Sequence, residues 1–273
     1  MKIATAGKGG SGKTTIAGTL SRILARKQGK ILAIDGDPNP NLAFALGIPT
    51  AASNTIPSIP SSLMQVVEDP DGGKRLVMSI SQEELISNYA AGAPDGIDLI
   101  VMGQPAHGSA GSGCMCASHR AVRGLIGEMS GYGEHTVTDM EAGLEHLKRG
   151  TVRNVDVMLV VTEPYYRSLE AAERTISLGR ELEIPHVYVV SNKVKNKSDQ
   201  AAIESFCSRH NLSILGMVPH DETFIEAERN ERSPIDFAPD SPGVQAISEI
   251  ASKLIALDSP QTRQKDESLG VQP

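Results

Sequence analysis

The stretch that decides the fold lies near the N-terminus and reads Gly7-Lys8-Gly9-Gly10-Ser11-Gly12-Lys13-Thr14-Thr15. It contains the pattern G-x-x-x-x-G-K-[ST], which binds phosphate where a strand passes into a helix. That context is present: the apolar run Ile3–Ala6 precedes the stretch, and apolar residues at helical spacing follow it over Thr14–Lys27. Glycines let backbone N–H groups converge on phosphate oxygens without side-chain clashes. We therefore expect Gly7 to Thr15 to line a nucleotide site.

Two side chains of this loop have defined tasks in the pattern. Lys13 is expected to reach the β- and γ-phosphates and to act in catalysis, and the Thr14 hydroxyl is expected to bind Mg²⁺. The N-terminus of the following helix adds partial positive charge beside the phosphates. The pattern thus predicts an ATPase that uses ATP or ADP together with Mg²⁺.

Short apolar runs alternate with helical patterns along the whole chain. This alternation predicts an α/β fold with a mostly parallel sheet of about seven or eight strands and helices on both faces. The strands are expected at Ile3–Ala6, Ile31–Ile34, Ile97–Met102, Thr136–Thr138, Val155–Thr162, His186–Ser191 and Leu212–Val218. The helices are expected at Thr14–Lys27, Ser118–Met129, Ser168–Glu183, Asp199–His210 and Val244–Leu257. The run at Thr136 is the weakest, because His135 and Thr138 dilute its apolar character.

No linker divides the chain, so we predict one P-loop ATPase domain over residues 1–257. Residues 47–96 are less regular and contain several prolines, which indicates an insertion. Within it we expect a short helix and a hairpin around Asp71-Gly72-Gly73. Residues 258–273 are polar and lack apolar periodicity, so they are predicted to be a disordered tail.

Composition argues against several classes of partner. Lys and Arg total 26, Asp and Glu total 33, and the net charge is −7. Such a chain, with 3% aromatic residues and no Trp, lacks the basic surface and stacking residues that nucleic acids require. It shows neither a secretory signal nor a run of roughly 18 apolar residues. We expect a cytoplasmic protein with no nucleic-acid or membrane partner, whose three cysteines are thiols or metal ligands.

Carboxylates follow two further strands. Asp35 and Asp37 lie in Asp35-Gly36-Asp37-Pro38, at the end of a strand where parallel sheets bind ligands. They can orient a water for attack on the γ-phosphate or support Mg²⁺, although an Asp pair before a proline is also common in turns. Residues 139–143 fit the switch pattern D-x-x-A-G. Asp139 is expected to hold Mg²⁺ through a water, and Gly143 to let the backbone follow the γ-phosphate state.

Two cysteines stand close together in Gly113-Cys114-Met115-Cys116, at the start of a predicted helix. A helix N-terminus favours thiolates, and thiolates suit Zn²⁺, other late transition metals or an iron–sulfur cluster. A closed tetrahedral site needs four ligands, so a twofold dimer would complete it with a second pair. Alternatively, both cysteines are half-buried residues beside a Gly-rich loop. Cys207 occupies an apolar helix position and is expected in the core.

Lys8 to Thr15 resembles the deviant Walker A motif, K-G-G-x-G-K-T-[ST]. That variant marks the ATPase class of the nitrogenase iron protein and of the division-site and plasmid-partition ATPases. The resemblance implies that Lys8 is catalytic and reaches across a homodimer interface to the partner's nucleotide. It also implies that Asp37 is the catalytic aspartate, with Asp35 nearer the metal. The spacing of the loop alone would also allow Lys8 to face solvent.

Three residues are expected near the base. The amide of Asn192, at the end of a predicted strand, offers the donor and acceptor that the edge of adenine needs. In related ATPases this Asn contacts the base. The segment Val218-Pro219-His220-Asp221 resembles the stretch that closes over the base, so Pro219 and Asp221 are assigned to the nucleotide site. Its backbone is expected to contribute more than the Asp221 side chain.

Taken together, the deviant loop, the Cys-x-Cys segment and Asp139–Thr151 resemble the nickel-insertion accessory ATPases of carbon monoxide dehydrogenase maturation, over about residues 1–255. The resemblance implies a homodimeric ATPase that binds Ni²⁺, or Zn²⁺ as a substitute, between subunits through Cys114 and Cys116. Nucleotide turnover would switch the dimer and promote nickel delivery to carbon monoxide dehydrogenase, the client enzyme.

Two other functions remain open at this point. One is an electron donor like the nitrogenase iron protein, whose cluster ligands are two well-separated cysteines per chain, whereas the pair here is adjacent. The other is a partition or positioning ATPase that binds DNA or membrane. The acidic charge and the lack of an amphipathic C-terminal helix argue against it.

Overall fold

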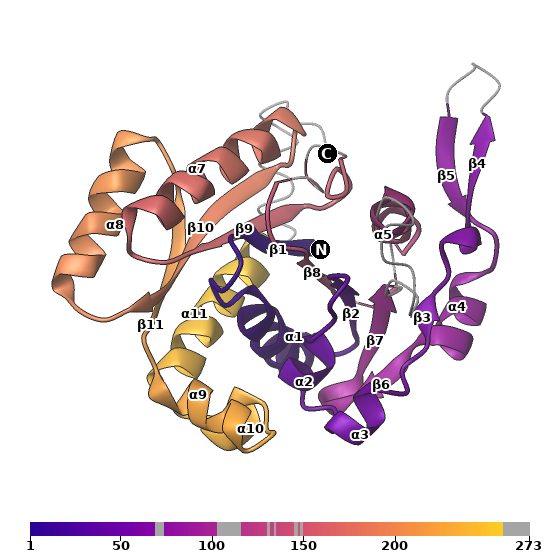
Figure 1. Cartoon of the computed structure of the whole chain (residues 1–273), viewed down its shortest axis with the longest axis horizontal. Coiled ribbons are helices and arrows are strands. Elements are labelled where there is room, and N and C mark those ends of the chain that lie inside the picture. Colours follow the sequence, from indigo (N-terminus) through magenta and orange to yellow (C-terminus); the bar gives the residue numbers. More distant parts are fainter. Residues whose placement is uncertain are drawn as a thin grey trace, which may run out of the picture.

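The computed structural model describes residues 1–68, 74–102, 116–129, 132–133, 135–144, 147 and 150–258. Within them, nine strands form one sheet in the order β11-β10-β9-β1-β8-β2-β7-β3, with β6 also paired to β7 (Figure 1). The strands are β1 (Lys2–Gly7), β2 (Ile31–Gly36), β3 (Ser58–Ile59), β6 (Ala91–Ala93), β7 (Ile97–Met102), β8 (His135–Met140), β9 (Val157–Thr162), β10 (His186–Val194) and β11 (Ile214–Pro219). Among the described pairings of this sheet, only that of β6 with β7 is antiparallel. The predicted fold class is confirmed, and the insertion supplies the added strands β3 and β6.

Helices cover both faces of this sheet (Figure 1). Successive strand residues point to opposite sides, so Ile3 packs in one hydrophobic cluster and Ala4 in the other. One side carries α1 (Lys13–Gln28), α2 (Leu42–Leu46) and α11 (Pro242–Leu257), and the other carries α4 (Gln82–Tyr89), α5 (Cys116–Glu128), α7 (Tyr166–Glu181) and α8 (Lys197–Arg209). The shorter helices are α3 (Thr50–Ser53), η1 (Ser61–Leu63), η2 (Pro94–Gly96), α9 (Glu222–Arg229) and α10 (Pro234–Phe237). Among the described residues, no helix is long and apolar enough to cross a membrane.

The strand that the sequence indicates most weakly lies at the centre of the sheet. β8 is longer than the predicted Thr136–Thr138, and all six of its residues are buried. It pairs in parallel with β1 on one side and β2 on the other, so its backbone groups are satisfied although its side chains are partly polar. Asp139 therefore lies inside the strand, opposite Asp35 of β2, rather than after it.

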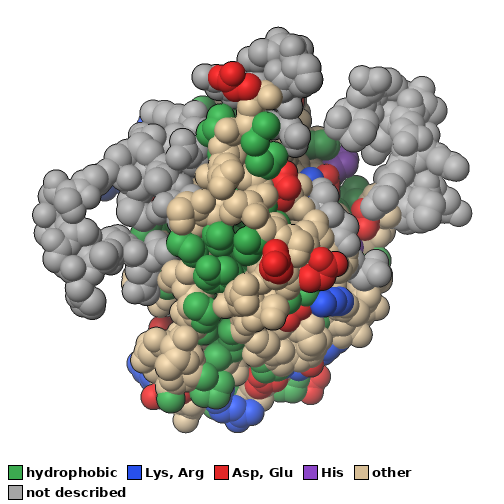
Figure 2. Space-filling model, turned by 90° about the vertical axis from the view of Figure 1, so that its right-hand side faces the viewer, with side chains coloured by type: hydrophobic (Ala, Val, Ile, Leu, Met, Phe, Trp, Pro, Cys, Tyr) green, Lys and Arg blue, Asp and Glu red, His purple; other side chains and the backbone are tan. Residues whose placement is uncertain are grey.

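The insertion forms the edge of the molecule beyond β7. A separate antiparallel pair, β4 (Met64–Glu68) and β5 (Lys74–Met78), supplies the two strands of the expected hairpin, whose connection at residues 69–73 lies outside the described residues. The pair stands away from the main sheet (Figure 1). Figure 2 shows hydrophobic side chains running down this edge of the molecule. On β4, the side chains of Val66 and Val67 have exposed fractions of 51% and 38%.

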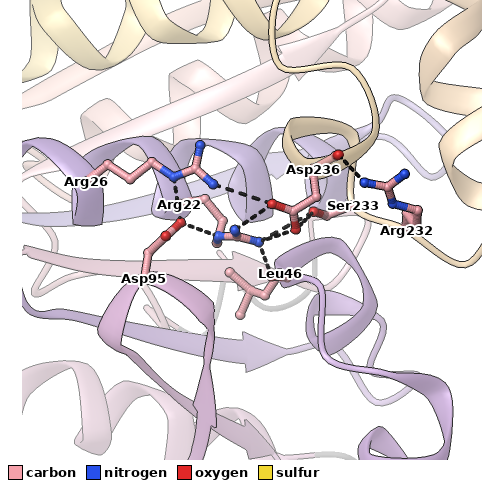
Figure 3. A network of polar contacts seen from close by, with 7 residues as sticks. All are labelled: Arg22, Arg26, Leu46, Asp95, Arg232, Ser233 and Asp236. Atoms are coloured by element: carbon pink, nitrogen blue, oxygen red, sulfur yellow. Dashed lines mark hydrogen bonds and ion pairs between the residues drawn. The ribbon is translucent and has the colours of Figure 1, made fainter.

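One buried arginine ties the phosphate-loop helix to the insertion and to the C-terminal region (Figure 3). Arg22 of α1 donates to Asp95 of η2 at 2.5 Å, to the Leu46 carbonyl at 2.7 Å and to both carboxylate oxygens of Asp236 in α10 at 2.8 Å. Burial opposes ionisation of Asp236, but the hydrogen bonds from Arg22 and Ser233 and the charges of Arg22 and Arg26 together outweigh it and hold the pKa of that carboxyl below its usual value. Three segments far apart in sequence therefore depend on one guanidinium.

We predict that Arg22→Ala lowers the free energy of unfolding by about 3 kcal/mol, because it leaves two partly buried carboxylates without their buried cation and with only the exposed Arg26 beside them. Arg26 contacts the same two carboxylates from a side chain that is 42% exposed, and Arg26→Ala should cost about 1 kcal/mol or less. Denaturant unfolding of both variants measures the difference. Equal losses would show that burial of Arg22 does not strengthen its contacts.

Candidate nucleotide site

The loop between β1 and α1 has a backbone that only glycine permits at two positions. Gly7 has φ 138°, and a Cβ there would lie 2.3 Å from the Val161 carbonyl oxygen of β9. Gly12 has φ 93°, and a Cβ there would lie 2.2 Å from the amide nitrogen of Asn192. Close packing of the loop against β9 and β10, together with left-handed backbone, explains the glycines. The loop therefore follows the strand and opens the helix as the sequence predicts.

The hydroxyl and the carboxylate assigned to Mg²⁺ are in contact. Thr14 Oγ1 donates to Asp139 Oδ2 at 2.5 Å, and Thr5 Oγ1 of β1 donates to Asp139 Oδ1 at 2.7 Å. Lys13 is buried, with its Nζ 3.4 Å from the Lys8 carbonyl oxygen. The tertiary structure thus brings Lys13, Thr14 and Asp139 together at the carboxyl ends of β1 and β8.

A second buried carboxylate lies beside the first. Asp35 is fully buried and accepts from the backbone N–H groups of Leu42 at 2.8 Å and Asp37 at 3.2 Å. Burial, and then repulsion from Asp139, raise the pKa of Asp35 to about 7. Burial also raises the pKa of Asp139, against the lowering effect of the hydrogen bonds from Thr14 and Thr5. Nearby positive charge does not fully balance these two buried carboxylates, so they are a suitable environment for a divalent cation.

Asp37 differs from Asp35 in its surroundings. It is only partly buried, and its Oδ1 accepts from the backbone N–H of Asn39 at 2.8 Å. This is the turn geometry that the D-x-D-P segment suggests. A more accessible carboxylate at this edge of the sheet remains available to a water, so the assignment of Asp37 as the catalytic aspartate stays a prediction.

The switch segment folds back onto the phosphate loop. Gly143 has φ 100°, a left-handed backbone conformation that favours glycine. Its N–H donates to the Gly7 carbonyl at 3.4 Å. A Cβ on Gly9 would lie 3.7 Å from the Cβ of Ala142. The D-x-x-A-G segment therefore contacts the loop that it is expected to sense.

The residues predicted near the base are held by contacts within the chain. Asn192 donates its amide N–H to the Ser11 carbonyl of the loop at 2.8 Å. The Asp221 carboxylate accepts from Thr223 Oγ1 at 2.7 Å, Thr223 N at 3.0 Å and Gly243 N at 2.8 Å. Together with a hydrogen bond from Ser241, these outweigh the effect of burial and lower the pKa of Asp221. Asp221 thus caps α9 and joins it to α11, while Pro219 ends β11. Their contact with a base stays a prediction.

The sequence motifs do not include two residues that lie near the loop, Lys193 and Glu163. Lys193 follows Asn192 and donates its Nζ to the Gly10 carbonyl at 2.7 Å and to Glu163 at 3.0 Å. Glu163 follows β9 directly. The position of Glu163 at the carboxyl end of a strand, where ligands of parallel sheets bind, is the signal that could have indicated it.

The cysteine pair lies at the limit of the described structure. Cys114 falls among residues 103–115, outside the described residues, and Cys116 begins α5 without a described side chain. Across the residues that are described, no group of three or more His, Cys, Asp or Glu side chains could hold a metal ion. Cys207 is 2% exposed, and burial raises its pKa to about 11, which confirms that it is a core residue. The metal assignment of Cys114 and Cys116 stays a prediction.

Comparison with known proteins now identifies the family. The sequence pattern of the CobQ/CobB/MinD/ParA nucleotide binding domain matches residues 2–235. The chain belongs to this family. It is therefore a nucleotide-binding ATPase. The assignment of the loop, the two buried carboxylates and the switch segment to its nucleotide site stays a prediction.

Relatives of this ATPase include an accessory protein of carbon monoxide dehydrogenase. The carbon monoxide dehydrogenase accessory protein CooC of Rhodospirillum rubrum is 34% identical over 88% of this chain and 91% of its own length. An uncharacterized ATP-binding protein of Methanocaldococcus jannaschii is 35% identical over 93% of this chain and 98% of its own. The MinD cell division protein of Aquifex aeolicus has the same fold, with a TM-score of 0.68, 22% identity, and coverage of 95% and 98% of the two chains.

The raised pKa of Asp35 makes the stability of the nucleotide-free ATPase depend on pH. Between its ordinary pKa of 3.8 and about 7, the folded chain holds a proton that the unfolded chain has released. The free energy of unfolding should therefore fall as pH rises, by up to about 1.4 kcal/mol per pH unit from this group, and level off once Asp35 is ionised in both states.

Denaturant unfolding of the wild type and of Asp35→Asn at several pH values measures the contribution of Asp35 together with its coupling to Asp139, because groups distant from Asp35 titrate alike in both proteins. The stability of the wild type relative to the variant should decrease across this window and then stay constant. A difference that is independent of pH would contradict the raised pKa.

Proposed function

We propose that this ATPase is a nickel-binding maturation factor that promotes insertion of nickel into carbon monoxide dehydrogenase and works as a nucleotide-switched homodimer. The observation that carries the proposal is the 34% identity with the carbon monoxide dehydrogenase accessory protein over 88% of the chain. The segment Gly113-Cys114-Met115-Cys116 supports it, because two adjacent thiols per subunit make half of a tetrahedral site.

In this proposal the phosphates of ATP lie on the loop, within reach of Lys13. Mg²⁺ fits the residues present, since the Thr14 hydroxyl and the buried Asp139 and Asp35 are the hard oxygen ligands that it prefers. The cation would neutralise charge on the phosphates. Asp37 orients the attacking water, and the contact between Gly143 and Gly7 lets the switch segment respond when the γ-phosphate leaves.

The dimer gives the metal site its remaining ligands. Nickel is cargo here: two copies of Cys114 and Cys116 hold it, and a change in the dimer after hydrolysis releases it. Metal analysis together with mass in solution, with ADP and with an ATP analogue, tests this arrangement. One nickel or zinc per two chains supports it, and a metal-free monomer in both nucleotide states contradicts it.

Two further measurements separate the competing functions. A broad visible absorption band after anaerobic purification would indicate an iron–sulfur cluster and an electron donor. Nucleotide-dependent sedimentation with liposomes would indicate a positioning ATPase. The fold neighbours MinD of Aquifex aeolicus and McdA of Cyanothece do not favour that alternative, because at 22% and 19% identity they show the fold alone.

We predict that the double variant Cys114→Ala/Cys116→Ala loses stoichiometric binding of nickel or zinc and keeps its affinity for ATP. Thiolates supply the metal ligands, whereas the nucleotide rests on the loop of residues 7–15. Equilibrium dialysis with metal analysis and a nucleotide titration measure the two properties. Cys207→Ala is the matched control, since that buried thiol should leave metal binding unchanged. Tight metal binding by the double variant would reject the site.

We predict that Lys8→Ala reduces ATP turnover about 100-fold or more and changes nucleotide affinity only about threefold or less. A cation that acts across the interface stabilises charge in the transition state and contributes little to ground-state binding. Steady-state turnover and nucleotide titration of the same preparation provide the comparison. Losses of equal size would show that Lys8 is an ordinary ligand within its own subunit.

A further inference from the structure

The ammonium of Lys8 is paired with an aromatic ring of its own subunit. Its Nζ lies 5.5 Å from the centroid of the Tyr165 ring, within the range of a cation–π contact. Lys8 is exposed on the phosphate loop, and Tyr165 is 44% exposed immediately before α7. Two exposed side chains from segments far apart in sequence therefore meet at the loop.

Contacts between β9 and α7 hold the Tyr165 ring in place. Tyr165 donates its hydroxyl to Glu163 Oε2 at 2.7 Å and its backbone N–H to the Glu163 carbonyl at 2.8 Å. Glu163 in turn donates its N–H to the hydroxyl of the buried Ser168 at 3.0 Å. The side chain of Glu163 is only 14% exposed. Tyr165 is thus fixed at the junction of β9 and α7 instead of moving freely in solvent.

The same carboxylate connects the ring to the phosphate loop. Glu163 Oε1 accepts from Lys193 Nζ at 3.0 Å, and Lys193 also donates to the Gly10 carbonyl at 2.7 Å. We call Tyr165, Glu163 and Lys193 the Tyr165 bracket. It spans from the ring under Lys8 to the backbone two residues further along the same loop. Its geometry therefore sets where Lys8 rests relative to the nucleotide site.

We propose that Tyr165 is a positioning residue for Lys8, whose ring holds the ammonium in a resting place within its own subunit. The inference rests on the proposed function, in which Lys8 reaches the nucleotide of a second copy of the chain. In that function the ammonium leaves the ring of its own subunit to reach a nucleotide bound to the second copy. Closure of the dimer must therefore break the contact with Tyr165. Nucleotide-driven closure has to offset the free energy of that contact.

The expected effect is modest, because both partners are exposed. Removing the ring from both subunits should strengthen the nucleotide-dependent dimer about five- to thirtyfold, the change in equilibrium that two exposed cation–π contacts, one in each subunit, support. Tyr165→Phe keeps the ring, so it should stay closer to the wild type than Tyr165→Ala. Tyr166 is the matched control, since it is adjacent and 69% exposed, and Tyr166→Ala should leave the dimer unchanged.

A spectroscopic measurement tests the resting contact without a dimer. Lysine labelled with ¹³C at Cε, assigned through Lys8→Arg, should show an upfield ring-current shift of the Lys8 methylene in the nucleotide-free monomer. Tyr165→Ala should abolish the shift, and both Tyr165→Phe and Tyr166→Ala should keep it. A Lys8 resonance that is the same in wild type and Tyr165→Ala would overturn the inference.

Sedimentation with a non-hydrolysable ATP analogue tests the release. The wild type should lose the ring-current shift on forming the dimer, Tyr165→Ala should dimerise more tightly, and this gain should vanish in a Lys8→Ala background. A dimer of equal or weaker affinity in Tyr165→Ala overturns the inference and leaves the dimeric function standing. A wild type that stays monomeric with the analogue contradicts the dimeric function itself, and with it the release of Lys8.

Discussion

The carboxylate of Asp139 is the contact on which the nucleotide site depends. Its two oxygens accept from Thr5 of β1 and Thr14 of α1, so one buried group fixes the first strand, the central strand β8 and the helix that carries the phosphate loop. A buried carboxylate is costly to ionise, and Asp35 lies opposite it on β2. The fold places these two acids where a cation is needed, so the requirement for charge compensation is part of the architecture.

Segments far apart in sequence hold the phosphate loop. Asn192 and Lys193 at the end of β10 bind the carbonyls of Ser11 and Gly10, and Glu163 holds Lys193. The switch segment reaches the loop from the opposite side through Gly143. A phosphate group on the loop would therefore be sensed by β8 through its switch and by β10 through its amide and lysine. Through these contacts, a change in the bound nucleotide can alter the positions of segments outside the site.

Much of the fold could be predicted from the sequence, because its signals are local. The run Ile97–Met102 matches β7 residue for residue, and the Gly-rich loop lies between a strand and a helix as its pattern requires. The strand predicted at Thr136–Thr138 is shorter than the observed β8, which shows where reasoning from local sequence fails. His135 and Thr138 look unfavourable for a buried strand, yet pairing on both sides satisfies the backbone of β8. The Asp221 carboxylate caps α9 and joins it to α11, contacts that no local pattern indicates, and its contact with a base stays a prediction.

The sequence by itself determined the α/β class, the phosphate loop, the acidic residues around it and the cysteine pair, since each is a pattern of neighbouring residues. Only the tertiary structure decided which residues meet across long separations. The Arg22 contacts with Asp95 and Asp236, the raised pKa of Asp35 and the pairing of Lys8 with Tyr165 are of this kind. Burial and side-chain direction arise from packing, and no local pattern specifies them.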